Sequence, residues 1–265
     1  MPRYVSLDSE KHLHAGWKSV SRMLFASTDM TVPVLLEELS HVITAIPLIF
    51  SRTDDRYELH ALLSPEPGRN LFVSPDGRWL TGYVPAHYRI HPFRAVPHPE
   101  TGKPTLCIAE DSGQLVEDAL AAGATPFFNS DGTPSESLAN VLNILQTLER
   151  GRQVTQRAVD ALATEGLLKP FHLKLQAGDA EETQRQVEGL YTIDEAALRK
   201  LPADALERLR DANALPVAYA QLLAQHRIQG FNKLYELHKS APGDASVPED
   251  ISDILSADSG TLSFG

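Results

Sequence analysis

The sequence has little cysteine and no long hydrophobic run. Its single cysteine, Cys107, cannot form a disulfide within the chain of 265 residues, so a disulfide scaffold is excluded and a reduced cytoplasm is the expected compartment. The longest apolar runs, 45–50 and 214–220, are far shorter than the roughly 20 residues of a membrane-spanning helix. Residues 1–16 contain charged and histidine side chains where a signal peptide needs an apolar stretch, so secretion by that route is not expected.

Positive charge is also scarce. The chain has 24 Lys and Arg against 35 Asp and Glu, which gives a formal net charge of -11. Because this charge repels phosphate groups and no basic stretch stands out, neither nucleic-acid binding nor attraction to an anionic membrane is expected. The segment 240–265 has acidic residues but no Lys or Arg, and its Ser, Asp, Gly and Pro content predicts a disordered tail.

Most motifs that carry well-known chemistry are missing. The sequence contains no Gly-rich phosphate loop ending in Gly-Lys-Ser/Thr, no strand-linked G-x-G-x-x-G, no H-E-x-x-H, no G-x-S-x-G and no paired-cysteine zinc signature. Phosphoryl transfer, dinucleotide binding and standard metalloprotease chemistry are therefore disfavoured. No catalytic residue and no cofactor follow from the sequence.

The pattern of the first third of the chain predicts short strands separated by turns that contain Pro, Gly and Asp. Residues 46–51 and 57–63 flank the polar turn 52–56 and predict an antiparallel hairpin. Further strands are expected at 70–73, before a Ser-Pro-Asp-Gly turn, and at 106–109. A short helix is expected over 32–41.

The rest of the chain is mainly helical in pattern. Thr133-Pro134-Ser135-Glu136 predicts a helix start with Thr133 as the cap, and Gly151 either divides the following helix or only weakens it before a stop at Gly166. A strand pair at 172–176 and 186–192 is followed by helices that begin near Asp194 and Pro202, and by a last helix over about 216–239 that is interrupted by Gly230. We therefore expect an α+β fold: an N-terminal antiparallel strand-rich part followed by a helical C-terminal half with one further hairpin, in a single domain over 1–239.

Aromatic, imidazole and guanidinium groups crowd the segment 79–98, and exposed groups of these kinds anchor binding interfaces. They make this segment the expected site for a protein or small-molecule ligand. The alternative is that the same rings pack a Pro-rich loop. The predicted binding residues are Trp79, Tyr83, His87, Tyr88, Arg89 and His91.

His87 and His91 are four residues apart, so on a helix they would share a face and could bind one metal ion. Pro92 opposes this geometry because it disfavours a helical conformation of His91. A third ligand would have to come from His98, Asp111 or His60, and we assign no metal site.

Two further side chains have competing interpretations. Cys107 is a possible nucleophile, but its position in the apolar run 105–109 favours a buried, unreactive thiol. His226 lies among the apolar residues of the last helix, which is typical of a core histidine.

Taken together, the ordered motifs resemble the bacterial SapC family, which is named for a gene in a surface-layer protein locus. The resemblance runs from about residue 4 to residue 238. It is carried by residues 5–12, 46–50, 70–73, 76–79, 83–85, 88–89, 92–93, 106–108, 127–128, 131–132, 189–195, 201–202 and 218–223.

The resemblance implies a soluble accessory protein, associated at most with surface-layer or exported-protein systems, and it brings no established active site. The leading hypothesis is thus a cytoplasmic, non-catalytic accessory or interaction protein. One alternative is a metal-dependent enzyme that uses a histidine cluster in the loop 79–98. Another is a peptide- or carbohydrate-binding module, for which ligand should change the fluorescence of Trp79. The oligomeric state does not follow from the sequence.

Overall fold

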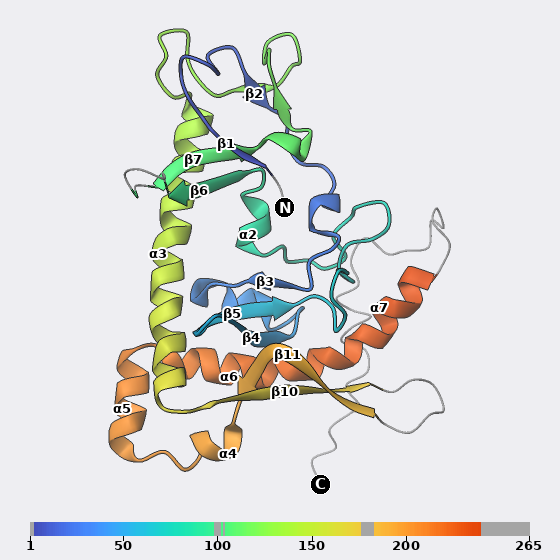
Figure 1. The fold of residues 1–265 in the computed structure, drawn as a ribbon, viewed down its shortest axis with the longest axis vertical. Coiled ribbons are helices and arrows are strands. Elements are labelled where there is room, and N and C mark those ends of the chain that lie inside the picture. Colours follow the sequence, from blue (N-terminus) through green and yellow to red (C-terminus); the bar gives the residue numbers. More distant parts are fainter. Residues whose placement is uncertain (1–2, 98–101, 103, 176–182, 240–265) are drawn as a thin grey trace. The chain divides into compact units, whose positions relative to one another are not determined.

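The computed structural model describes residues 3–97, 102, 104–175 and 183–239 (Figure 1). The chain forms two compact units. Unit 1 comprises Met1–Phe25 and Ala86–Arg150, and unit 2 comprises Ala26–Pro85 and Gly151–Gly265. The predicted acidic tail and His98 lie outside the described residues. The single domain expected over 1–239 stays a prediction.

Unit 1 contains two small antiparallel sheets and one apolar cluster. One sheet has the order β1 (Tyr4–Ser6), β7 (Pro104–Ala109), β6 (Phe93–Pro97), and the other has the order β8 (Leu115–Val116), β2 (Gly16–Trp17), β9 (Thr125–Pro126). The short helix η3 (Glu110–Ser112) joins β7 to β8, α2 (Ala86–Arg89) precedes β6, and η1 (Leu24–Ala26) follows β2 where the chain passes from unit 1 to unit 2. The buried residues of the cluster are Ala15, Phe93, Ile108, Phe127 and Leu138.

Unit 2 is built on a five-stranded antiparallel sheet. Its order is β10 (Leu168–Leu175), β11 (Thr183–Ile193), β4 (Leu48–Thr53), β5 (Arg56–Leu62), β3 (Thr31–Pro33). The strand β3 leads into η2 (Leu36–Glu38) and α1 (Leu39–Val42), and β11 leads into α4 (Glu195–Leu198), α5 (Ala203–Asp211), α6 (Ala214–Ala224), η4 (Gln225–Gln229) and α7 (Gly230–Lys239). Helix α6 lies against β11 and β4 (Figure 1).

Helix α3 (Glu136–Thr164) is one continuous helix of 29 residues. Gly151 therefore does not divide it. Gly151 is instead closely packed, because a Cβ atom there would lie 3.0 Å from Glu37 Oε2 and 3.1 Å from Leu35 Cδ1. The helix ends before Gly166, whose φ of +66° is the left-handed conformation expected of a stop residue.

The α+β class is confirmed, with strands mostly in the N-terminal half and helices in the C-terminal half. The hairpin β4–β5 is confirmed, although its turn is shorter than expected because Asp54 adopts a positive φ of 54°. The strand pair is confirmed as β10 and β11. Asp194 caps α4 as predicted, since its carboxylate accepts hydrogen bonds from the backbone N–H groups of Ala196 and Ala197.

Three local predictions were wrong. Residues 70–73 form only an isolated bridge between Val73 and Trp79, although the turn after them is present, with the N–H of Gly77 donating to the Ser74 carbonyl. The expected helix 32–41 begins as strand β3. The side chain of Thr133 contacts Asp131, so the α3 cap is Ser135, whose Oγ accepts from the N–H of Leu138. The last helix, expected over about 216–239 with an interruption at Gly230, is present as α6, η4 and α7, and α7 begins at Gly230.

Candidate functional site

The six predicted binding residues do not form a single described cluster. Trp79 and Tyr83 belong to unit 2, whereas the four residues from His87 to His91 belong to unit 1. The chain passes from one unit to the other between Pro85 and Ala86, within the predicted segment. The site is therefore described as two separate groups of residues.

Trp79 and Tyr83 are half-buried and are held by hydrogen bonds within unit 2. The indole N–H of Trp79 donates to the carbonyl of Tyr83 and to Thr81 Oγ1, both at 2.8 Å. The Tyr83 hydroxyl donates to Glu38 Oε1 at 2.7 Å. The Trp79 ring stacks on Phe72 with 5.8 Å between ring centroids. Both polar tips are thus engaged inside the unit, which favours the packing interpretation for this half of the segment.

Glu38 and His41 complete this group and were not predicted from the sequence. Glu38 is only 4% exposed, and its second oxygen accepts a hydrogen bond from the N–H of Leu35 at 2.9 Å. The exposed imidazole of His41 stacks on the Tyr83 ring with 5.1 Å between centroids. Glu38 lies 45 residues from Tyr83 in the sequence. Because no local pattern links residues so far apart, this group could not be predicted from the sequence.

The unit 1 half of the segment is divided between exposed and buried side chains. His87 and Arg89 are exposed on α2, whereas Tyr88 is buried. The half-buried His91 follows the helix, and its imidazole stacks on the Phe25 ring with 3.7 Å between centroids and an interplanar angle of 3°. The Phe25 ring also meets Tyr88 edge to face. His91 and Tyr88 therefore pack the unit, and the side chains of His87 and Arg89 are exposed at its surface.

The histidine pair does not share a helix face. Helix α2 ends at Arg89, so His91 lies beyond it, as the following proline predicted. Within the described part of the chain, no three His, Cys, Asp or Glu side chains lie close enough together to hold a metal ion. His98, one of the three possible third ligands, is outside that part.

Burial lowers the pKa of His91 from its ordinary value of 6.5, while the nearby carboxylate of Asp111 acts weakly in the opposite direction. The folded state then binds fewer protons here than the unfolded state, so the contribution of His91 to stability is present above pH 6.5 and is lost as the pH falls below it. We expect His91→Phe, which keeps the ring stack, to reduce the loss of unfolding free energy between pH 7.5 and 5.5. Urea titrations at both pH values measure this.

The control for this prediction is His14→Phe, because the imidazole of His14 is exposed. It should leave the pH dependence of the wild type unchanged. An equal change in both variants, or none in His91→Phe, would contradict the assigned role of His91.

Cys107 is buried in β7, and burial raises the pKa of its thiol. Its Sγ contacts the carbonyl of Thr105 at 3.6 Å. A raised pKa decreases the thiolate fraction at neutral pH, so the environment favours the unreactive interpretation of this residue.

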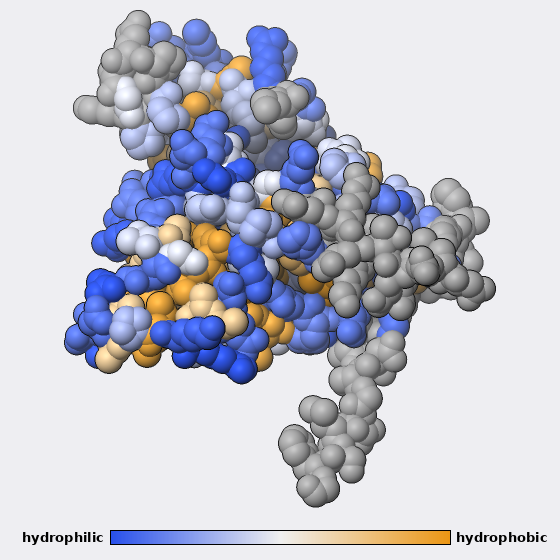
Figure 2. All heavy atoms as spheres, turned by 60° about the horizontal axis from the view of Figure 1, so that its bottom comes forward, coloured by the Kyte–Doolittle hydropathy of each residue, from blue (hydrophilic) through white to orange (hydrophobic). Residues whose placement is uncertain are grey.

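A different surface in unit 2 has the character of a binding site. Six large hydrophobic side chains are exposed among the described residues, and three of them lie on α5 and α6: Leu206, 38% exposed, Tyr219, 54%, and Leu223, 62%. Figure 2 shows hydrophobic residues gathered on the surface of unit 2 where these helices lie. We call this surface the α5–α6 face. It comprises Leu206, Leu215, Pro216, Tyr219, Leu222, Leu223 and His226.

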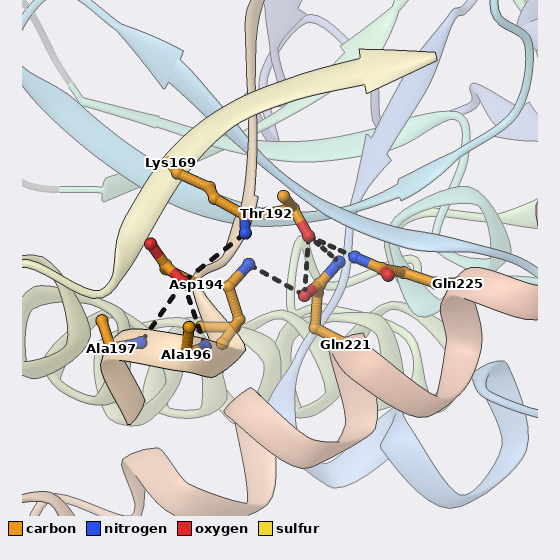
Figure 3. Close-up of polar contacts among 8 residues, drawn as sticks. Lys169, Thr192, Asp194, Ala196, Ala197, Gln221 and Gln225 are labelled. Carbon is orange, nitrogen blue, oxygen red and sulfur yellow. Dashed lines mark hydrogen bonds and ion pairs between the residues drawn. The ribbon is translucent and has the colours of Figure 1, made fainter. Parts of the chain in front are cut away.

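The opposite side of α6 is fixed to the sheet by Gln221, which is fully buried (Figure 3). Its side-chain oxygen accepts from the N–H of Ile193 at 3.0 Å, and its amide nitrogen donates to the carbonyl of Leu48 at 3.1 Å. The Thr192 hydroxyl contacts both ends of the same amide and also Gln225. Because these bonds join α6 to β11 and β4, they determine which side of the helix faces solvent.

The exposure of α6 was not predicted. The segment 214–224 is apolar on nearly all sides, with the sequence ALPVAYAQLLA, so its pattern does not indicate which residues face water. The signal that was present is the lone Gln221 in an apolar helix, which marks the buried polar contact and hence the opposite, exposed side. The core role predicted for His226 is wrong, since its side chain is exposed and contacts the carbonyl of Leu223.

The two ends of the α5–α6 face differ in charge. On α5, Arg208 pairs with Glu165 and Asp204, and Arg210 pairs with Glu207 and Asp211, so two arginines face four carboxylates. Beyond them, residues 212–235 contain no acidic residue but include His226, Arg227 and Lys233. The α5 end of the face therefore has more carboxylates than arginines, whereas residues 212–235 on the η4 side have basic and imidazole side chains but no carboxylate.

Comparison with known proteins gives one match. The family model SapC matches residues 7–231. No curated protein and no solved structure matches the chain. Among the described residues, no helix is both long and apolar enough to cross a membrane.

Proposed function

The chain belongs to the SapC family, and we propose that it acts as a non-catalytic accessory protein that binds a protein partner through the α5–α6 face. The observation that carries this proposal is the exposure of Tyr219 and Leu223, 54% and 62%, on a helix whose position is fixed by buried hydrogen bonds. Contiguous apolar surface on a rigid element is typical of protein interaction sites.

A link to surface-layer or exported-protein systems and a cytoplasmic location remain part of the same proposal, on the basis of the family resemblance. The binding residues predicted in the segment 79–91 also remain a prediction. In that segment, His87 and Arg89 have the exposed side chains that a partner can contact, whereas Tyr88 is buried.

The proposal is tested by placing a photo-crosslinking benzoylphenylalanine at Tyr219 in cells that produce the full chain. We expect irradiation to give covalent adducts, and we expect Leu223→Glu to reduce them at least ten-fold, because a carboxylate in the apolar contact is desolvated without a partner. The variant should still fold, since Leu223 is largely exposed and surface substitutions usually change stability by no more than about 0.5 kcal/mol.

The matched control places the same crosslinker at Leu120, which is 94% exposed in unit 1. It tests whether any exposed hydrophobic position captures neighbours. The proposal fails if adducts form equally from both positions, or if those from Tyr219 persist in the Leu223→Glu variant.

A further inference from the structure

We propose that the partner of the α5–α6 face is a second copy of this chain, bound across a two-fold axis that passes near Tyr219. This inference rests on the proposed function, because it assumes that the face is a docking surface. It adds the identity of the occupant and the geometry of the contact.

The apolar part of the face is arranged symmetrically about Tyr219. On α6, Leu215 and Pro216 precede it by four and three residues, and Leu222 and Leu223 follow it by three and four. Residues at these spacings lie on the same side of a helix. When two copies of α6 pack antiparallel, Leu215 and Pro216 of one copy lie opposite Leu222 and Leu223 of the other.

The charges at the two ends favour the same arrangement. The acidic end near α5 has four carboxylates around two arginines, whereas the opposite end has His226 and Arg227 and no acidic residue. An antiparallel pair places the acidic end of each copy beside the basic end of the other, so the surface is complementary to itself.

The size of the α5–α6 face determines the affinity expected for the dimer. Helix α6 has 11 residues and is about 16 Å long, and stable dimers bury about 800 Å² on each partner. One short helix with a side chain from α5 provides less than this. We therefore expect a dimer with a dissociation constant in the micromolar range. Monomer and dimer should exchange reversibly, and the dimer fraction should increase with protein concentration.

The first test is sedimentation equilibrium of the full chain from about 1 to 200 µM. We expect the apparent mass to rise from 29.1 kDa toward twice that value. Leu223→Glu should weaken the association at least ten-fold, and Leu120→Glu, the matched substitution in unit 1, should leave it unchanged. An apparent mass of 29.1 kDa at every concentration overturns the inference.

The second test concerns the two-fold axis. In Tyr219→Cys, the two introduced thiols lie beside each other and should form a disulfide between chains when copper phenanthroline is added as oxidant. The native thiol of Cys107 is buried and should not react. Leu120→Cys should give little crosslinked dimer under the same conditions. Equal crosslinking of both variants overturns the proposed axis.

The third test concerns the charges. In a dimer of His226→Glu chains, the new carboxylate at the η4 end of each copy meets the carboxylates at the α5 end of the other. In a dimer of Asp211→Arg chains, the new guanidinium at the α5 end of each copy meets the basic side chains at the η4 end of the other. We expect each variant to associate at least ten-fold more weakly than the wild type. A mixture of the two should recover dimerisation, because each acidic end then meets a basic end. Failure of the mixture to recover overturns the antiparallel arrangement.

Photo-crosslinking from Tyr219, with adducts identified by mass spectrometry, separates this inference from the proposed function. Adducts between two copies of the chain support both. Adducts with a different protein support the proposed function and overturn the second copy as the occupant. Adducts with residues 240–265 of the same chain overturn both, as does the absence of any adduct.

Discussion

A Gln221→Leu variant is expected to lose about 3 kcal/mol of unfolding free energy. Leucine has a volume close to that of glutamine, so the substitution removes hydrogen bonds with little change in packing. It leaves the N–H of Ile193, the carbonyl of Leu48 and the hydroxyl of Thr192 without this partner, in surroundings where Gln221 itself is 0% exposed. Each buried group that loses its partner costs about 1–3 kcal/mol.

The effect is measured by urea unfolding that is followed through tryptophan fluorescence. The chain has two tryptophans, of which Trp17 belongs to unit 1 and Trp79 to unit 2. In a Trp17→Phe background, the remaining signal reports unit 2, where Gln221 lies. The free energy of unfolding is compared between the chain with Gln221 and the Gln221→Leu variant, both in the Trp17→Phe background.

Gln225→Leu is the matched control, because Gln225 is half-buried and its side chain joins this network through the Thr192 hydroxyl alone among the described residues (Figure 3). It should cost about 1 kcal/mol. If the two variants are equally stable, Gln221 does not hold α6 on the sheet in the way the contacts indicate. Since the exposed face of α6 depends on this attachment, Gln221→Leu should also weaken the self-association proposed for Tyr219 and Leu223.

The elements predicted correctly are those whose causes are local. The hairpin β4–β5 follows from two β-favouring runs around a polar turn, and the α4 cap follows from Asp194 placed two and three residues before the N–H groups that it binds. The stop of α3 follows from Gly166. In each case the interacting groups lie within a few residues of one another, so the sequence contains the whole interaction.

The predictions that were wrong depended on groups distant in sequence. Thr133 and Ser135 are both suitable helix caps, and Ser135 fills this position, with its hydroxyl also donating to the carbonyl of Pro126 at 2.7 Å. Residues 32–41 begin as a strand because Thr31–Pro33 pairs with β5. The local sequence pattern does not reveal these tertiary partners.

The candidate site shows the same limit. Trp79, Tyr83 and His91 were singled out for their chemistry, but whether such rings bind a ligand or fill a core depends on neighbours such as Phe72, Glu38 and Phe25. Conversely, nothing in the apolar pattern of 214–224 distinguishes Tyr219 and Leu223 from their neighbours. Their exposure follows from the long-range bonds of Gln221, whose partner Leu48 is 173 residues away.

Gly16→Ala is expected to destabilise unit 1 by about 3 kcal/mol or more. Gly16 lies in β2, the central strand of its sheet, and a Cβ atom there would lie 2.3 Å from the carbonyl oxygen of Thr125 and 2.7 Å from Ala119 Cβ. The closest obstacle is backbone, which cannot rotate away, so β2 and β9 must separate. Overpacking of this kind typically costs about 1–3 kcal/mol, and more where the backbone must move.

Separation of these strands would also disturb the aromatic cluster beside them. Trp17, the next residue, stacks on Phe127 at 5.2 Å and meets Phe93 edge to face at 5.1 Å between ring centroids. In a Trp79→Phe background, the remaining fluorescence reports this cluster directly. We expect Gly16→Ala to lower the urea midpoint and to shift the emission of folded Trp17 toward that of a solvent-exposed indole.

Gly113→Ala distinguishes a steric clash from backbone strain. Gly113 has a positive φ of 74°, and a Cβ atom there meets nothing within 4 Å. Gly113→Ala should therefore lower the free energy of unfolding only by the cost of the left-handed conformation, about 1–2 kcal/mol. The emission of Trp17 should not change. If Gly16→Ala costs no more than Gly113→Ala, the strands β2 and β9 are not packed against each other as closely as the contacts of Gly16 require.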